Sequence, residues 1–206
     1  MKLFWVILFL TSLNTYSQSA AQSFYELSSP EKWWVFFHPF KAKRALIISH
    51  EALLVSDSIS NTNQLINDLN GGQLDAFKHS YWMVGLAIKI GMKPALKLGK
   101  AHEKGNYKTF KKGKSEDGYV PDKISSDMDL YNNNTGAQIA NNYGHLTKED
   151  LIELIIEKIK KGKMKVIKKD DRGNFLNCDG DIIPDKILLG IWENDKCLIF
   201  SNASIN

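Results

Sequence analysis

Three short polar clusters lie on segments that otherwise have the pattern of buried helices. They are Asp75 to Trp82 (DAFKHSYW), Ala101 to Glu103 (AHE) and Asp127 to Asn134 (DMDLYNNN). Carboxylates, imidazoles and amides are costly to bury without partners, so a helix that faces a core seldom carries them alone. Three such helices predict one shared polar site inside a helical bundle, and such a site is more often functional than structural.

Hydrophobic periodicity predicts a mainly α-helical chain. In residues 73–90, Leu74, Phe77, Tyr81, Val84 and Ile88 recur at spacings of three and four, which is the helical period. Further helices are expected over 40–56, 95–104, 127–143 and 151–159. Ser29 and either Ser125 or Ser126 are expected as N-caps. Residues 105–123, rich in glycine and lysine, predict an exposed loop, which places the AHE cluster near a helix C-terminus.

The pattern changes after Met164. A hairpin is expected between residues 165–168 and 175–176, with further short strands at 186–190 and 197–200. The predicted fold class is therefore a mainly α helical bundle with a small C-terminal β-hairpin appendage.

The first 22 residues predict a secretory signal peptide. Lys2 precedes an apolar run over residues 3–10 and a stretch of small polar residues over 17–21, with cleavage expected between Ser17 and Ser23. The run is too short for a stable membrane span, although a retained anchor is the alternative. Residues 23–162 are then expected to form the helical domain with the polar site, and 163–206 a β-rich tail packed on it. The mature protein is expected to be secreted or periplasmic.

Charge and cysteine content restrict the partners. The formal charge is +4, and arginine occurs only at Arg44 and Arg172, so no nucleic-acid-binding module is evident. Lysines at 108–114 and 158–169 favour solubility, or alternatively a weak contact with anionic lipid or phosphate-bearing partners of the cell envelope. Protein partners are not indicated. In an exported chain, Cys178 and Cys197 either form a disulfide or remain free.

The spacing within each cluster suggests its chemistry. Asp75 and His79 are four residues apart and share a helix face, so they bind one metal, or the aspartate orients the imidazole. A solvated ion pair is the alternative. His102 can serve as ligand or base near neutral pH, and Glu103 as acid or base if the helix ends there. Asp129 and Asn133 repeat the four-residue spacing.

Together these groups favour an exported metal-dependent hydrolase that acts on a phosphoester or lipid. One divalent ion (zinc, manganese or calcium) is expected, with Asp75, His79, His102 and Asp129 as ligands. The predicted catalytic residues are His79, His102, Glu103 and Asp129. The predicted substrate-binding residues are Lys78, Tyr81, Trp82, Asn132 and Asn133. The alternatives are a non-catalytic envelope protein whose polar residues form a structural hydrogen-bond network, and an exported toxin.

The three clusters also resemble the motifs D-A-F-R/K-H-x-Y-W, A-H-E and M-D-L-x-N-N-x-x-G of an uncharacterised family of bacterial exported proteins. The similarity covers roughly Trp33 to Gly144. It implies a helical fold and a shared polar site, and no particular reaction. Members of that family often carry an arginine after the motif glycine, where this chain has Ala137.

Overall fold

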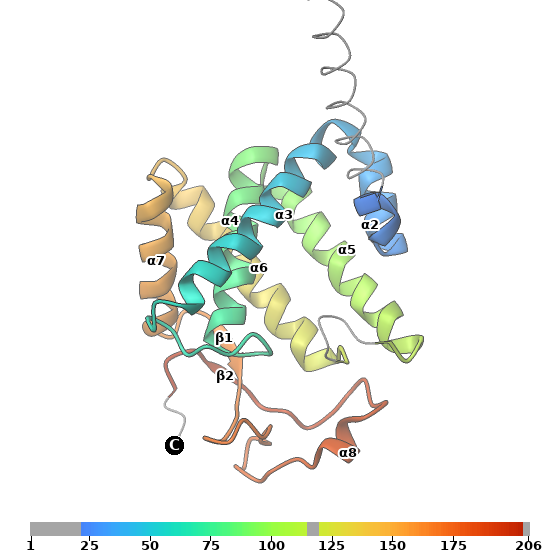
Figure 1. Cartoon of the computed structure of the whole chain (residues 1–206), viewed down its shortest axis with the longest axis vertical. Helices are drawn as coiled ribbons and strands as arrows, with labels where there is room; N and C mark the ends of the chain where they lie inside the picture. The colour runs from blue at the N-terminus through green and yellow to red at the C-terminus, as the bar shows by residue number, and fades with distance from the viewer. Residues whose placement is uncertain (1–21, 115–119, 204–206) are drawn as a thin grey trace, which may run out of the picture.

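The computed structural model describes residues 22–114 and 120–203. The predicted signal peptide lies outside them, apart from its last residue. The helices are α2 (Ser29–Phe37), α3 (Pro39–Ser60), α4 (Gln73–Ile90), α5 (Met92–Lys111), α6 (Lys123–Tyr143), α7 (Lys148–Lys160) and α8 (Asp185–Leu188), and the strands are β1 (Lys165–Ile167) and β2 (Leu198–Phe200). The predicted class is confirmed, because a helical bundle carries one small antiparallel sheet near the C-terminal end (Figure 1). No helix in the described ranges is long and apolar enough to cross a bilayer.

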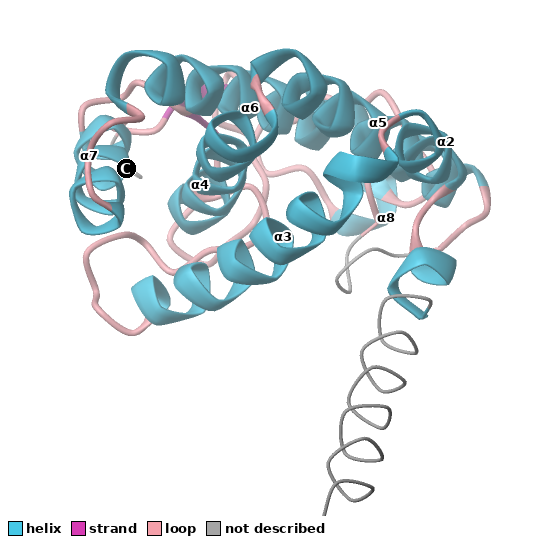
Figure 2. Ribbon diagram, turned by 90° about the horizontal axis from the view of Figure 1, so that it is seen from above, coloured by secondary structure: helices cyan, strands magenta, loops and turns pink. Residues whose placement is uncertain are grey.

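Helix α4 lies at the centre of the bundle. It packs against α3, α5, α6 and α7 (Figures 1 and 2). Phe77 and Tyr81 belong to an apolar cluster that includes Ile155 of α7, and Met83 and Leu86 belong to a second cluster shared with α2 and α5. Apolar side chains therefore cover most of α4, and any polar residue on it needs a partner from a neighbouring helix.

Gly136 allows α6 to approach α4 closely. A Cβ atom at this position would lie 2.5 Å from the carbonyl oxygen of Ser80 and 3.1 Å from Cβ of Met83. The backbones are therefore in direct contact, and this contact brings the polar cluster of α6 against that of α4.

Helix α5 is longer than predicted, because it continues past Gly105 to Lys111. Gly105 serves packing and does not end the helix, since a Cβ there would lie 2.4 Å from Oγ of Ser28, beside α2. The predicted loop over 105–123 is therefore wrong in its first part. His102 and Glu103 lie well inside α5 and not at its C-terminus.

Two helices are capped by an earlier residue than expected. Ser28, and not Ser29, caps α2, in a capping box with Glu31. Asp122, and not Ser125 or Ser126, caps α6, and it accepts a 2.8 Å hydrogen bond from the Ser125 backbone N–H. A carboxylate is as effective at this position as the hydroxyl predicted for it.

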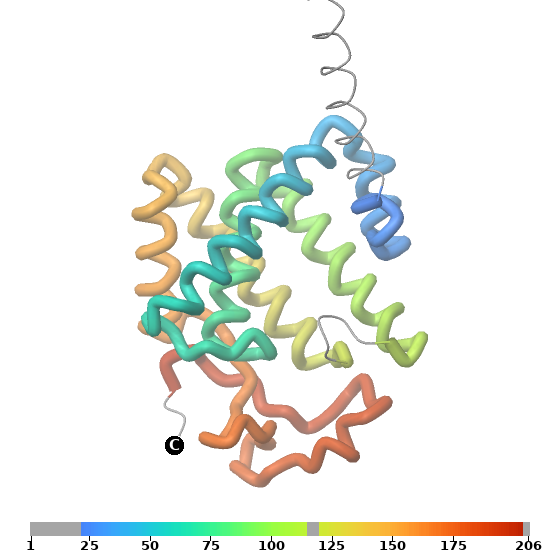
Figure 3. Tube along the Cα trace, viewed as in Figure 1, coloured from blue at the N-terminus to red at the C-terminus, as the bar shows by residue number. Residues whose placement is uncertain are grey.

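The C-terminal tail crosses the ends of the helices (Figure 3). Strand β1 pairs with β2, with Val166 opposite Ile199. The expected partner of β1, residues 175–176, contributes only isolated bridges. A disulfide joins Cys178 to Cys197, which is one of the two alternatives that the sequence left open. The Leu176 N–H donates to the Lys168 carbonyl, so the chain turns back on itself as predicted, and the Cys197 backbone accepts from Lys168 and donates to Leu176 beside this turn. The strand expected over 186–190 is wrong, since α8 occupies most of it.

Candidate metal centre

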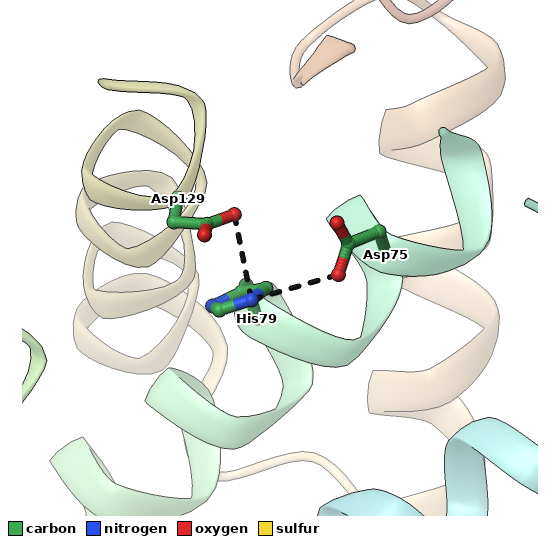
Figure 4. A group of neighbouring side chains, drawn as sticks. All are labelled: Asp75, His79 and Asp129. Carbon is green, nitrogen blue, oxygen red and sulfur yellow. Dashed lines mark ion pairs between the residues drawn. The ribbon is translucent and has the colours of Figure 1, made fainter. Parts of the chain in front are cut away.

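Two of the three predicted polar clusters meet at the contact between α4 and α6. Asp75 and His79 of α4 and Asp129 of α6 point toward one another (Figure 4). His79 Nε2 lies 3.4 Å from Oδ1 of Asp129 and 3.6 Å from Oδ1 of Asp75. One ligand atom from each residue lies within 4.8 Å of the other two, and all three residues are buried. These three side chains form a group that could hold a metal ion.

A glycine turn orients Asp75. The Gly71 backbone N–H donates a 2.9 Å hydrogen bond to Oδ2 of Asp75. Gly71 has φ of +85°, a conformation that residues with a side chain rarely adopt. Asp75 also lies in the first turn of α4, where the helix dipole favours a carboxylate. This arrangement leaves Oδ1 facing His79 and Lys78, whose Nζ lies 3.0 Å away.

The surroundings of His79 favour its neutral form. Burial lowers the pKa of its imidazole well below the usual value, and the positive charges of Lys78 and His102 lower it further, whereas the Asn133 amide acts in the opposite direction. Nδ1 of His79 and both amide atoms of Asn133 make no hydrogen bond of ordinary geometry. A neutral imidazole is the form that binds metal ions.

His102 lies beside this group and is not one of its three members. Its ring centre is 6.4 Å from that of His79, and its Nδ1 is 3.0 Å from Oε1 of Glu31. Burial would raise the pKa of Glu31, but the hydrogen bond and charge of His102, helped by Ser28, lower it to about 2. The predicted assignment of His102 as a ligand of the same ion therefore lacks a matching geometry, whereas the Glu31–His102 pair is suited to proton transfer.

Sequence reasoning missed Glu31 and Asn106. Glu31 ends a capping-box pattern that starts at Ser28, a signal that fixes its position but not its partner. Asn106 fell in the predicted loop, yet it is buried and donates a 3.2 Å hydrogen bond to Oε2 of Glu103. Glu103 is itself buried in mid-helix. The condition under which it was predicted to act, a helix end at this point, is not met.

The predicted substrate-binding residues separate into two sets. Lys78 pairs with Asp75, and the Trp82 ring lies 6.5 Å from that of His79 and 5.7 Å from that of His102, so both border the Asp-His-Asp group. Tyr81 faces α3 instead, where its hydroxyl donates a 3.0 Å hydrogen bond to Glu51.

Of the two asparagines of α6 that were predicted to bind substrate, one lies beside His79 and the other does not. Asn132 is fully buried, and its amide exchanges hydrogen bonds of 2.9 and 3.0 Å with the Lys165 backbone, which favours a structural role in holding β1. Asn133 lies beside His79 and against Gly99, where a Cβ would be 3.1 Å from its Nδ2. The following Ala137, which stands in place of the arginine, is buried among apolar side chains.

A groove with a volume of about 560 Å³ lies between the start of α2 and the second half of α5. Its lining includes Glu31 and Asn106, the partners of His102 and Glu103. It also includes Lys32, Lys108, Lys112 and Lys114. A smaller cavity lies against β1. Neither cavity is lined by Asp75, His79 or Asp129.

These features define a helical protein with a buried Asp-His-Asp group between two helices. The chain belongs to the family described as Domain of unknown function (DUF6973), whose model matches residues 32–163. The match contains all three polar clusters and ends just before β1. No curated protein matches the chain. No solved structure matches it either.

Proposed function

We propose that this protein is an exported metal-dependent hydrolase whose divalent ion is held by Asp75, His79 and Asp129. The observation that carries the proposal is the spacing of the three ligand atoms. The separations of 3.4 and 3.6 Å from His79 Nε2 exceed the usual hydrogen-bond range of about 2.7–3.2 Å. These two separations are close to the edge of a tetrahedron around zinc, about 3.3 Å for bonds of about 2.0–2.1 Å, and the two carboxylate oxygens lie within 4.8 Å of each other.

The charges of the group support a cation. Two carboxylates, one lysine and a neutral imidazole carry a formal charge of −1 in a buried position. Buried carboxylates are retained where they are paired or bind a metal. Lys78 supplies a single positive charge to Asp75 at 3.0 Å, and its side chain is 20% exposed, so it can move outward when an ion binds.

The ligand set favours zinc or manganese over calcium. Calcium takes six to eight oxygen ligands, whereas this group includes an imidazole nitrogen. Two carboxylates and one imidazole suit zinc and manganese, and zinc binds more tightly at a given site. Three protein ligands leave a fourth position for water, whose pKa a zinc ion lowers to about 7.

The Glu31–His102 pair supplies the proton-transfer group in this proposal. Glu31 holds Nδ1 of His102 at 3.0 Å and fixes the orientation of the ring. The groove that Glu31 lines carries four lysines, which favour a phosphate-bearing substrate. A phosphoester, of a lipid or a small molecule, is therefore the substrate class we propose.

Export is the proposed setting of this activity. The N-terminal pattern of residues 1–22 supports it, as does the Cys178–Cys197 disulfide, since disulfides persist in oxidising compartments.

A second candidate function is a non-catalytic envelope protein. It is favoured by the low exposure of the three ligand residues, 6–7% each, and by their absence from the lining of both cavities. A buried polar group of this kind can specify the packing of α4 on α6 without chemistry.

Metal content distinguishes the two functions. The purified protein is measured by inductively coupled plasma mass spectrometry beside His79→Ala, Asp129→Asn and the control His50→Ala, whose residue is exposed on α3. The hydrolase is supported if the parent and the control contain about one equivalent of zinc or manganese and both site variants lose it. The parent must also cleave bis(p-nitrophenyl) phosphate in a metal-dependent reaction. If the protein binds metal but cleaves neither phosphoesters nor phospholipids, it is a metal-binding protein and the proposed hydrolase activity is wrong. No metal after incubation with each ion supports the structural network.

A further inference from the structure

Helix α2 is aromatic on the face that points away from the protein. Trp33, Phe36 and Phe37 are 62%, 69% and 68% exposed, and Phe40 at the start of α3 is 94% exposed. The ring centre of Trp33 lies 5.7 Å from that of Phe36 and 5.9 Å from that of Phe37. These four residues are named the aromatic patch. Contiguous exposed apolar patches of this kind mark interaction sites.

The packing of α2 does not require the aromatic patch. Trp34 on the opposite side is 5% exposed, donates a 3.0 Å hydrogen bond to the Pro94 carbonyl and stacks on His38 with ring centres 4.7 Å apart. Trp34 therefore anchors α2 to the bundle. The aromatic patch is left for a different contact.

The apolar surface continues along α3. Ile47 and Leu54 follow Phe40 at intervals of seven residues, which is close to two helical turns, so the three side chains lie on one side of the helix. Ile47 is 51% exposed and Leu54 is 72% exposed. Helix α3 runs along the outside of the bundle (Figure 2). The apolar surface therefore extends well beyond the four aromatic residues.

Basic residues accompany the aromatic patch. Residues 32–44 contain no acidic residue. Lys43 and Arg44 are exposed and follow Phe40 by three and four positions, on the same side of α3, whereas Nζ of Lys41 donates to the Ile90 carbonyl and Nζ of Lys32 to the Tyr25 carbonyl. Aromatic and aliphatic side chains beside lysine and arginine are the composition of helices that lie in the interface of a bilayer. A second copy of the chain is a less suitable partner for the aromatic patch than a bilayer, because a twofold interface would bring the same basic residues face to face.

We propose that the aromatic patch docks this protein on the surface of an anionic lipid bilayer. Trp33, Phe36 and Phe40 enter the boundary between headgroups and acyl chains, and the neighbouring basic residues contact lipid phosphates. The patch begins about ten residues after the expected signal-peptide cleavage zone, which ends at Ser23. Docking of this kind does not depend on the metal centre.

Vesicle co-sedimentation tests the proposal with the full chain. The parent protein is compared with the triple variant Trp33→Ser, Phe36→Ser and Phe40→Ser. The matched control is Ile182→Ser, Ile187→Ser and Leu189→Ser, which replaces side chains in the tail that are 56%, 49% and 67% exposed. The vesicles contain either phosphatidylglycerol with phosphatidylcholine or phosphatidylcholine alone, and circular dichroism confirms that each variant is folded.

We expect the parent and the control to bind the anionic vesicles, and the patch variant to bind at least about tenfold more weakly, because three inserted side chains are lost. Binding should also weaken in Lys43→Gln with Arg44→Gln and at high salt. Equal binding of parent and patch variant would assign the contact to the N-terminal run and overturn the proposal. A dimer seen by light scattering that the patch variant loses, without vesicle binding, would overturn it in favour of a second copy.

Discussion

His79 Nε2 on α4 faces Oδ1 of Asp129 on α6 at 3.4 Å, slightly closer than the 3.6 Å to Asp75 on its own helix. The imidazole nitrogen thus lies between carboxylates of two different helices. Because the ligands come from both helices, an ion bound here would hold α4 and α6 together. Metal binding and folding stability should therefore be coupled.

Zinc or manganese should stabilise the parent protein. At a free metal concentration about 100 times Kd, binding adds about 2.7 kcal/mol to the free energy of unfolding. His79→Ala and Asp129→Asn should abolish the increase in Tm on metal addition, measured by differential scanning fluorimetry after treatment with a chelator. His50→Ala should retain it, because His50 is exposed on α3. An equal increase in Tm for the parent and His79→Ala would contradict the site.

Gly136→Ala should destabilise the bundle and, with it, the contact between His79 and Asp129. The added Cβ would lie 2.5 Å from the Ser80 carbonyl oxygen, so α6 must move away from α4. Overpacking of this kind typically lowers the free energy of unfolding by about 1–3 kcal/mol. The shift in the midpoint of urea unfolding measures this change. The control Asn134→Ala, at an exposed position of the same helix, should change stability by less than about 0.5 kcal/mol. A Gly136→Ala protein as stable as its parent would show that the close approach is not needed.

The sequence was most informative where periodicity and spacing decide the outcome. The bounds of α4 were predicted as observed, and Asp75 and His79 share a helix face as their four-residue spacing indicated. Gly105 shows where the same reasoning failed. A glycine ends a helix or allows close packing, and only the position of Ser28 in three dimensions decides between them.

Contacts between distant parts of the chain could not be predicted from local patterns. Glu31 meets His102 across 71 positions, and Asn132 meets Lys165 across 33. Nothing in the sequence near Asn132 distinguishes an amide that binds backbone from one that binds substrate. The predicted hairpin is correct only near its turn, where Lys169 pairs with Phe175, whereas residues 165–167 pair with the distant β2.

The pair of Glu31 and His102 should make stability fall in acid. The folded-state pKa of Glu31 is about 2, against an ordinary value of 4.5, so the ionised carboxylate is favoured in the folded protein. Its contribution is fully present above pH 4.5 and is lost as the pH falls from 4.5 toward 2. At about 1.36 kcal/mol per pKa unit, the loss is of the order of 3 kcal/mol. Urea unfolding at a series of pH values measures it.

Glu31→Gln separates this effect from general acid unfolding. The variant should be less stable than the parent at pH 7, and the difference should shrink as the pH approaches 2. Glu26→Gln is the control. Glu26 lines the same groove, but it is exposed and its carboxylate accepts a hydrogen bond from Gln22. If the free energies of unfolding of the parent and Glu31→Gln differ by the same amount at pH 7 and pH 3, the pKa of Glu31 is not lowered in the folded protein.

The tail should be released when the buried pair of Asp122 and Lys196 is broken. Nζ of Lys196 lies 2.6 Å from Oδ2 of Asp122, and both side chains are buried. Although burial raises the pKa of Asp122, the charge and hydrogen bond of Lys196, together with Ser125, lower it below the ordinary value. Asp122→Asn leaves the Lys196 ammonium buried without its carboxylate, which typically costs about 3–5 kcal/mol. Denaturant unfolding and amide hydrogen exchange of residues 164–203 measure the effect.

An exposed pair on the same helix gives the matched control. Lys123 and Asp127 pair at 2.7 Å with side chains that are 45% and 44% exposed, so Asp127→Asn should cost less than about 1 kcal/mol. Replacing both buried partners, Asp122→Leu with Lys196→Met, should recover most of the stability lost in Asp122→Asn, because no buried charge remains. If Asp122→Asn costs no more than Asp127→Asn, the pair does not hold the tail, and the Cys178–Cys197 disulfide and the Asn132–Lys165 contact would have to hold it instead.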